Sequence, residues 1–373
     1  MKVMYLESEE ETVVLPKPFS NMIVEERGKK ARLSIPNENY LGGNSFYLFD
    51  GSNACDVLRR VRMREGEGVK TVQSLQRLAL CLFWTYKTGN SVNELAFSED
   101  GHLGVAAGSC AYILDQNGNL VSKYCEIGAM SDVSYCCDKF GFINWNGNAY
   151  IYDLINGTWG RIYVGDGYDH AITMLKDGFL AGDYNLAYFK FDGSKKWDMS
   201  MNYITNYLGN GPAVYKEYVY VPRYGWFHWG EGALTILKLS NGSEVKSILF
   251  NENVWDAQVC GKYLALGTAH HVILYDISDP TNPRLLWGFG GMATRCNGVG
   301  CGGARNVAFS PDRRYLISTN VEDKKIHIFN IQAGKQVLER LFEDWVISVS
   351  WWRDRIAVGL RNGIVYVFKF IKP

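Results

Sequence analysis

Arg305-Asn306-Val307-Ala308-Phe309-Ser310-Pro311-Asp312 is the stretch that decides the fold of this 373-residue chain. It contains a short apolar strand and a polar turn, and a second apolar strand follows at Tyr315–Ser318. The same order occurs at Leu95–Gly101, where Leu-Ala-Phe-Ser precedes Glu-Asp-Gly. This unit recurs along the chain, and its equivalent positions are Leu95, Val133, Ile172, Ala213, Ala257, Val307 and Val349.

The successive spacings of these positions are 38, 39, 41, 44, 50 and 42 residues. A period of about 40 to 45 residues with four strands per unit is typical of a β-propeller. A third strand with an aromatic pattern follows in most units, and it reads Ala111–Asp115, Ala149–Asp153, Ala187–Asp192, Val272–Asp276 and Ile326–Asn330. Turns such as Asn156-Gly157 then lead into an outer strand. We therefore predict an all-β chain that folds as a single β-propeller over residues 1–373.

The number of blades depends on the N-terminal region. Residues Asn39–Gly51 read as the second and third strands of another blade, which predicts eight blades of four antiparallel strands. A seven-bladed ring with an N-terminal extension is the alternative. In the eight-bladed arrangement, residues 52–78 are an insertion before an outer strand near Leu80–Thr85. The last unit ends after three strands, so we expect residues 1–10, with Lys2–Leu6 as the strand, to close the ring.

Two junctions resemble those of known propellers. The segments Leu82–Gly101 and Arg305–Asp312 resemble the passage from outer to inner strand in WD-repeat and quinoprotein-like propellers, and Leu274–Pro283 looks like the related LVIVD-type repeat. The resemblance covers roughly residues 40 to 370, and it implies the propeller fold without implying one function. The Gly-His and Trp-Asp dipeptides typical of WD repeats are largely absent.

The composition suits a folded chain without a global electric field. Apolar residues make up 47% and charged residues 21% of the chain, which excludes a disordered protein. The 39 Lys and Arg residues balance 39 Asp and Glu residues, so no overall charge steers the chain to nucleic acid or to an anionic membrane.

We expect a cytoplasmic protein without a membrane segment. The N-terminal residues contain no apolar stretch of signal-peptide length, and the longest apolar run, Leu78–Trp84, is far too short to span a bilayer. The chain has nine cysteines, an odd number that cannot all pair within it, so we expect free, mostly buried thiols in a reducing compartment. The nine are Cys55, Cys81, Cys110, Cys125, Cys136, Cys137, Cys260, Cys296 and Cys301.

One face of the propeller is the predicted site of function. Propeller connectivity places the turns between second and third strands, and the links between blades, on the same face. The loop Arg223–Trp229 falls there, and its residue types dominate interface hot spots, although packing over its own blade is the alternative. The glycine-rich link 288–306 reads as a lid or a docking loop on that face. The predicted partner-binding residues are Arg223, Tyr224, Trp226, Phe227, His228, Trp229 and Arg295.

The sequence predicts no metal or other cofactor. Cys296, Cys301 and His270 carry groups that bind zinc and fall on the same face, but their spacing is not that of a Cys-x-x-Cys knuckle. Cys136 and Cys137 are neighbours in a strand-like run, so we expect their side chains to point to opposite faces of the sheet.

A row of arginines in the insertion has two interpretations. Arg60, Arg62 and Arg64 would share one side of a strand, where they could contact phosphates or an acidic partner. An arginine row on an outermost strand more commonly forms a solvated edge that resists aggregation.

Three functional hypotheses follow. The chain contains no Gly-x-Ser-x-Gly elbow, no His-Glu-x-x-His motif and no Walker loop, so the first hypothesis is a non-catalytic scaffold that binds protein partners as a subunit or adaptor of a complex. The second is a metal-dependent hydrolase or lactonase that uses axial groups such as Asp169 and His270. The third is a nucleic-acid-associated propeller that binds through Arg59–Arg64 with steep salt dependence.

Overall fold

The computed structural model of the chain describes residues 78–165, 171–182, 185–200, 207–208, 211–224, 231–290 and 304–372, together with five strands before residue 78. Those five strands are β1 (Lys2–Glu7), β2 (Ile23–Arg27), β3 (Lys30–Ile35), β4 (Arg62–Glu65) and β5 (Gly68–Thr71). Two compact units divide the chain. One contains Met1–Phe83 and Phe368–Pro373, and the other contains Trp84–Val367.

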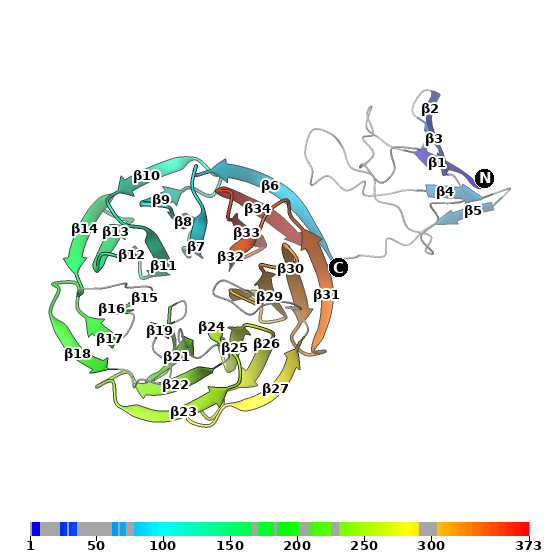
Figure 1. Cartoon of the computed structure of the whole chain (residues 1–373). Coiled ribbons are helices and arrows are strands. Elements are labelled where there is room, and N and C mark those ends of the chain that lie inside the picture. Colours follow the sequence, from blue (N-terminus) through cyan, green and yellow to red (C-terminus); the bar gives the residue numbers. More distant parts are fainter. Residues whose placement is uncertain are drawn as a thin grey trace. The chain divides into compact units, whose positions relative to one another are not determined.

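The described residues form seven antiparallel blades arranged in a ring (Figure 1). In each blade, strand a lies nearest the centre and strand d forms the rim. Blade 1 contains β7 (Val92–Phe97), β8 (Leu103–Ala107), β9 (Cys110–Leu114) and β10 (Leu120–Cys125). Blade 2 contains β11 (Met130–Cys136), β12 (Lys139–Asn144), β13 (Asn148–Asp153) and β14 (Thr158–Tyr163). Blade 3 contains β15 (Ala171–Leu175), β16 (Gly178–Gly182), β17 (Asn185–Phe189) and β18 (Lys195–Ser200).

The remaining blades follow the same plan. Blade 4 contains β20 (Ala213–Tyr215), β21 (Tyr218–Tyr224), β22 (Gly232–Lys238) and β23 (Glu244–Phe250), with β19 (Tyr207–Leu208) also pairing with β21; blade 5 contains β24 (Val254–Cys260), β25 (Tyr263–Thr268), β26 (Val272–Asp276) and β27 (Arg284–Phe289); blade 6 contains β28 (Val307–Phe309), β29 (Tyr315–Asn320), β30 (Lys325–Asn330) and β31 (Lys335–Leu341); blade 7 contains β32 (Val346–Trp352), β33 (Arg355–Leu360), β34 (Ile364–Ile371) and β6 (Ala79–Lys87).

The propeller has seven blades across the described residues, so the prediction of eight is wrong and the seven-bladed alternative is confirmed. All seven equivalent positions predicted from the repeat lie on a strand a, from Leu95 on β7 to Val349 on β32. The residues assigned to an eighth blade, Asn39–Gly51, lie outside the described residues. Each inner strand that the repeat identified in the sequence therefore corresponds to one blade of the structure.

The ring is closed by a different strand from the one predicted. In blade 7 the sheet order is β32-β33-β34-β6, so the outer strand comes from Ala79–Lys87. The predicted closing strand at Lys2–Leu6 instead pairs within an N-terminal sheet, where Lys2 lies opposite Ile35 on β3. The outer strand near Leu80–Thr85 was correctly located, but it completes the last blade and not an additional one.

The N-terminal strands form two small sheets of their own. β1, β3 and β2 make a three-stranded antiparallel sheet, and β4 pairs with β5. Residues 52–78, predicted as an insertion, contain this β4–β5 hairpin.

Apolar side chains between neighbouring blades form the core. Phe140 and Tyr150 of blade 2 pack in one buried cluster with Ile113 of blade 1. The blades approach so closely at Gly104 that a Cβ there would lie 2.7 Å from the Phe140 ring, which only glycine avoids. The middle strands are thus buried on both faces, which explains their nearly continuous apolar sequence.

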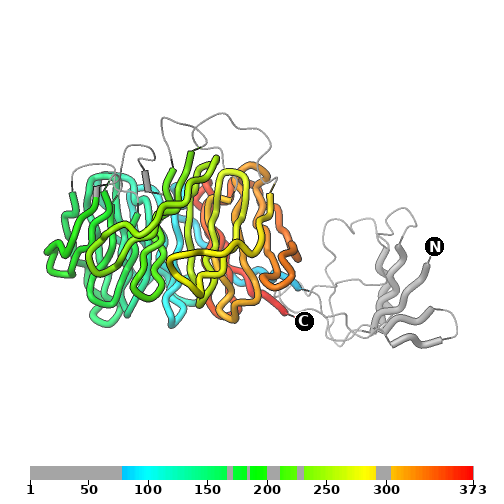
Figure 2. The backbone as a smooth tube through the Cα atoms, turned by 90° about the horizontal axis from the view of Figure 1, so that it is seen from below, coloured from blue at the N-terminus to red at the C-terminus, as the bar shows by residue number. Residues whose placement is uncertain are grey.

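The two faces of the ring differ in their loops. Strands run between these faces, as the edge-on view shows (Figure 2). We call linker face the side that carries the b–c turns and the links between blades, and hairpin face the side that carries the a–b and c–d turns. On the linker face, the amide of Met130 donates to Gly108 O at 2.7 Å, and the amide of Trp145 donates to Ala129 O at 3.1 Å. These bonds join links to b–c turns, as the connectivity predicted.

The expectation of free thiols is wrong for one cysteine pair. Cys110 on β9 lies directly opposite Cys125 on β10, and the two form a disulfide. Their strand register brings them together, and that register could not be read from sequence spacing alone.

Candidate functional site

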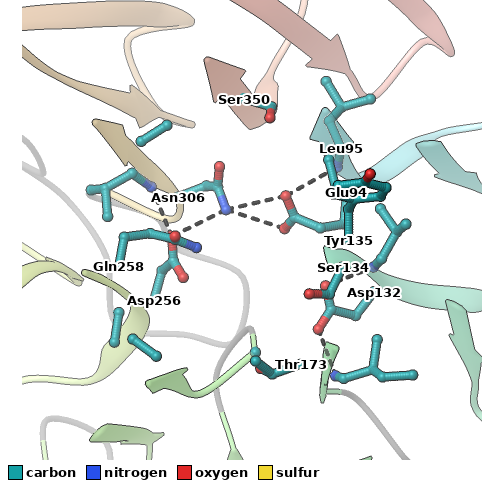
Figure 3. A pocket seen from close by; sticks show the side chains of 18 of the residues that line it. Glu94, Leu95, Asp132, Ser134, Tyr135, Thr173, Asp256, Gln258, Asn306 and Ser350 are labelled. Atoms are coloured by element: carbon teal, nitrogen blue, oxygen red, sulfur yellow. Dashed lines mark hydrogen bonds between the residues drawn. The ribbon is translucent and has the colours of Figure 1, made fainter. Parts of the chain in front are cut away.

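A cavity of about 280 Å³ lies on the axis of the propeller, lined by strand a or its flanking residues from all seven blades (Figure 3). Its lining extends from Glu94 to Phe97 along β7 and from Asp132 to Tyr135 along β11. Because these strands run from the linker face to the hairpin face, the carboxylates mark the end nearer the linker face. Figure 3 shows Glu94, Asp132 and Asp256 arranged around this cavity.

These carboxylates belong to a polar layer made by the residue that precedes each repeat position. In five blades that residue is polar and buried: Glu94, Asp132, Asp256, Asn306 and Ser348. This layer was not predicted from the sequence, although polar residues at one fixed place in otherwise apolar strands were visible. Strand a is the innermost strand of its sheet, so no further strand pairs with its edge at the axis. The polar layer lies along this edge, where main-chain groups need other hydrogen-bond partners.

Most of these side chains satisfy a main-chain amide of the next blade. Ile172 N donates to Asp132 Oδ2 at 2.7 Å, Val307 N donates to Asp256 Oδ2 at 2.8 Å, and Val349 N donates to Asn306 Oδ1 at 2.8 Å. Between blades 7 and 1, Leu95 N donates to Ser348 Oγ at 3.0 Å. The layer therefore ties neighbouring blades together around the axis.

Asn306 also bridges two carboxyl groups across the cavity. Its Nδ2 donates to both Glu94 oxygens at 3.2 Å and to Asp256 Oδ2 at 3.1 Å. The Ser348 hydroxyl donates to Glu94 Oε1. One buried network thus connects blades 5, 6, 7 and 1. The dashed lines in Figure 3 show the bonds of Asn306 to Glu94 and Asp256.

The carboxyl groups of this layer take up protons more readily than exposed carboxyl groups do. Burial raises the pKa of Asp256 to about 7 and that of Asp132 to about 8, and it raises the pKa of Glu94 well above its ordinary value. The negative charges of Asp132 and Asp256 raise the pKa of Glu94 further. Asp256 Oδ1 accepts no hydrogen bond from the described residues.

The side chains named from the sequence as zinc-binding types are described only in part. Among them, no three His, Cys, Asp or Glu side chains gather closely enough to hold a metal ion. His270 donates its main-chain amide to Glu252 Oε2 at 2.8 Å, on the b–c turn of blade 5. Cys296, Cys301 and Asp169 lie outside the described residues.

The predicted partner-binding loop is described only at its beginning. Arg223 is buried within blade 4, where desolvation lowers the pKa of its guanidinium group. The Tyr224 ring packs on Trp255 with ring centroids 4.6 Å apart. The rest of the predicted surface lies outside the described residues: Trp226, Phe227, His228, Trp229 and Arg295.

The predicted arginine row is partly described. Arg62 and Arg64 both lie on β4, opposite Thr71 and Val69 of β5. Arg62 and Arg64 are therefore alternate residues of one strand. Arg60 lies outside the described residues.

A cluster of exposed apolar side chains lies on the linker face of blade 2. Ile127 is 85% exposed, Tyr163 is 57% exposed and Trp145 is 45% exposed. We call these three residues the blade-2 patch. None of the three was singled out as a site from the sequence.

Hydrogen bonds bring the blade-2 patch together from three chain segments. Asn146 Nδ2 donates to Ile127 O at 2.8 Å, which joins the link before blade 2 to the b–c turn that carries Trp145. Val164 N donates to Gly147 O at 2.8 Å, and Tyr163 lies opposite Asn148 in the sheet. One side-chain and one main-chain hydrogen bond therefore hold the three segments next to one another.

Comparison with known proteins adds no assignment, since neither a protein-family model nor a curated protein matches this sequence. The propeller architecture rests on the strand pairing described above. Within the described residues, no helix has the length and apolar character needed to cross a membrane.

Proposed function

We propose that this protein is a non-catalytic propeller scaffold that binds a protein partner on its linker face, with the blade-2 patch at the centre of the contact. The observation that carries the proposal is the exposure of Ile127, Trp145 and Tyr163 on hydrogen-bonded segments of one face. Large apolar and aromatic side chains are usually covered in a monomer, and Trp and Tyr are enriched in interface hot spots.

The surroundings of the patch indicate the chemistry of the partner. Arg161 Nη1 and Glu126 Oε1 form an ion pair of 2.9 Å beside it, on the strand and link that border the patch. An apolar centre with a charged, hydrated rim is the usual anatomy of a protein–protein interface. The proposed partner is therefore a protein that presents apolar side chains with polar groups around them.

The patch is tested by replacing Trp145 with Ala together with Ile127→Ser. We expect the double variant to bind the partner about 30- to 100-fold more weakly, because a hot-spot tryptophan contributes about 2 kcal/mol or more. Tagged full-length protein first retrieves the partner from the source cells. Calorimetric titration of the purified pair then measures the dissociation constant.

Ile155→Ser is the matched control for this experiment. Ile155 is 75% exposed on the same blade, but it lies in a c–d turn on the hairpin face. Binding should be unchanged in this variant. Equal loss of affinity in both variants, or a partner bound with wild-type affinity by the double variant, would contradict the proposal.

The relation to WD-repeat and quinoprotein-like propellers is part of this proposal. It is supported by two turns of the same construction, in which the Ser98 hydroxyl donates to Asp100 and the Ser310 hydroxyl donates to Asp312. Both turns join strand a to strand b. Scaffolding is a common use of such propellers, so the relation favours the same function.

A second candidate function is hydrolysis of a small substrate in the axial cavity. It is favoured by Asp256, whose pKa of about 7 and unpartnered Oδ1 suit a general acid or base. Assays with lactones and esters would show activity that Asp256→Asn abolishes and Trp145→Ala leaves intact. Elemental analysis of the purified protein would decide whether that activity needs a metal.

A further inference from the structure

Two adjacent cysteines lie in the tightest hairpin of blade 2. Cys136 is the last residue of β11 and lies opposite Lys139, so Cys137 and Asp138 form a two-residue turn. Both turn residues have positive φ, 52° for Cys137 and 61° for Asp138. This is the pattern of a type I′ turn, in which the second cysteine no longer follows the strand.

The turn brings the two sulfur atoms together. Cys136 Sγ lies 2.7 Å from Cys137 Sγ. The expectation that the two side chains point to opposite faces is wrong, because it assumed an extended strand through Cys137. The two side chains therefore point toward each other, as a disulfide between them requires.

The surroundings make this pair reachable from solvent. Cys137 is exposed and Cys136 is half-buried. Burial and the neighbouring thiol raise the pKa of Cys136 to about 12, so the exposed Cys137 is the group that meets an oxidant first. The turn also adjoins the cavity, since Tyr135 lines it and the Asp138 amide donates to the Tyr135 hydroxyl at 3.2 Å.

We propose that Cys136 and Cys137 are a redox modification site, at which a small-molecule disulfide such as oxidised glutathione converts the dithiol to a vicinal disulfide. The Cys137 thiolate attacks one glutathione sulfur, and the other leaves as a thiolate. The Cys136 thiolate then attacks Cys137 Sγ and expels the second glutathione thiolate. Two protein thiols are oxidised, one glutathione disulfide is reduced, and the two protons pass to the leaving thiolates.

A disulfide between adjacent residues can be reduced again easily, for a geometric reason. The Cα atoms of adjacent residues lie about 3.8 Å apart, whereas disulfides usually join Cα atoms about 4.4 to 6.8 Å apart. The vicinal disulfide is therefore strained, and strained disulfides are reduced more readily than relaxed ones. This inference concerns the hairpin face and does not depend on the proposed partner surface.

The test equilibrates the full-length protein with mixtures of reduced and oxidised glutathione. Remaining thiols are trapped by alkylation, and tandem mass spectrometry assigns the label at each cysteine. We expect Cys136 and Cys137 to lose their label together, with no glutathione attached and the mass of two hydrogen atoms missing. The change should extend over about a hundredfold range of the glutathione ratio, as for a two-electron couple.

Two single variants keep the outcome decisive. In the Cys137→Ser variant, Cys136 should be either alkylated or glutathionylated, because it has no adjacent thiol with which to form a disulfide. Cys260→Ser removes a half-buried thiol of blade 5 and should leave formation of the Cys136–Cys137 disulfide unchanged. A stable glutathione adduct on wild-type Cys137, independent labelling of the two residues, or a bond from either of them to another cysteine would overturn the proposal.

Discussion

Replacing Asn306 with alanine should lower the free energy of unfolding by about 3 to 5 kcal/mol. The side chain donates to Glu94 and Asp256 and accepts from the amide of Val349, all within the buried layer. Alanine leaves the amide of Val349 without its partner and removes one donor each from Glu94 and Asp256, which keep their bonds from Ser348 and Val307 N. An unsatisfied buried polar group costs about 1 to 3 kcal/mol, and each lost hydrogen bond to a buried carboxyl group adds about 1 kcal/mol or more. Equilibrium unfolding in denaturant, monitored by tryptophan fluorescence, gives the difference.

Ser350→Ala is the matched control in the same cavity. Among the described residues, one donor reaches Ser350 Oγ, which is Phe97 N at 3.1 Å. This bond joins the same two blades as Ser348 does. Its loss should cost only about 1 kcal/mol. An Asn306→Ala variant no less stable than this control would show that the bridge does not hold the blades together.

Asn306→Asp separates the charge effect from the loss of a contact. Aspartate keeps an acceptor for Val349 N but adds a fourth carboxyl group to the layer. The variant should therefore be strongly destabilised at pH 8.5 and recover much of its stability near pH 5, where protonated carboxyl groups can donate hydrogen bonds. Equal destabilisation at both pH values would contradict this explanation.

Stability should fall as pH rises from 5.5 to 8.5. The folded protein holds protons on Asp256 up to about pH 7 and on Asp132 up to about pH 8, whereas the unfolded chain releases them near pH 4. The unfolded state therefore binds fewer protons in this window, and the free energy of unfolding decreases as pH increases. At roughly 1.4 kcal/mol per pH unit, Asp256 alone accounts for about 2 kcal/mol of this loss.

Asp256→Asn tests the assignment, because the amide cannot ionise and has nearly the same shape. Its stability should decline less steeply with pH, and above pH 8 it should equal or exceed that of the wild type. Asp279→Asn is the control: this exposed carboxyl group has a lowered pKa, so its titration lies below the window. A slope that is unchanged in Asp256→Asn and reduced in Asp279→Asn would refute the assignment.

The two predictions bear on the choice between the candidate functions. If Asn306 and the carboxyl groups contribute mainly stability, the axial layer acts as a set of ties between blades, and the linker face remains the site of function. If Asp256→Asn stabilises the protein while abolishing hydrolysis, the layer keeps an energetically costly carboxyl group for catalysis. The same variant thus distinguishes the scaffold from the hydrolase.

Much of the fold could be predicted from local sequence. The seven positions from Leu95 to Val349 identified every strand a, and the outer strand near Leu80–Thr85 was found. The type of each loop followed from its position in the repeat, which placed the loop beginning at Arg223 on the linker face. The polar layer was also within reach, because Glu94, Asp132 and Asp256 each precede a repeat position.

Other features needed the arrangement in space. Whether β6 completes the last blade or an eighth one is decided by pairing between ends of the ring that are far apart in sequence. The Cys110–Cys125 disulfide depends on register, and the Cys136–Cys137 contact depends on a turn that begins one residue earlier than the strand pattern suggests. The blade-2 patch joins three segments, none of which is distinctive alone.

The sequence by itself determined the repeating blade, because strand pairing within a blade and the burial of its middle strands are encoded by residues close together in the chain. Only the tertiary structure decided how the ring closes, which polar side chains meet on the axis and which apolar side chains stay exposed together. These depend on contacts between blades, and a repeat that is similar in every blade carries little information about which copies become neighbours.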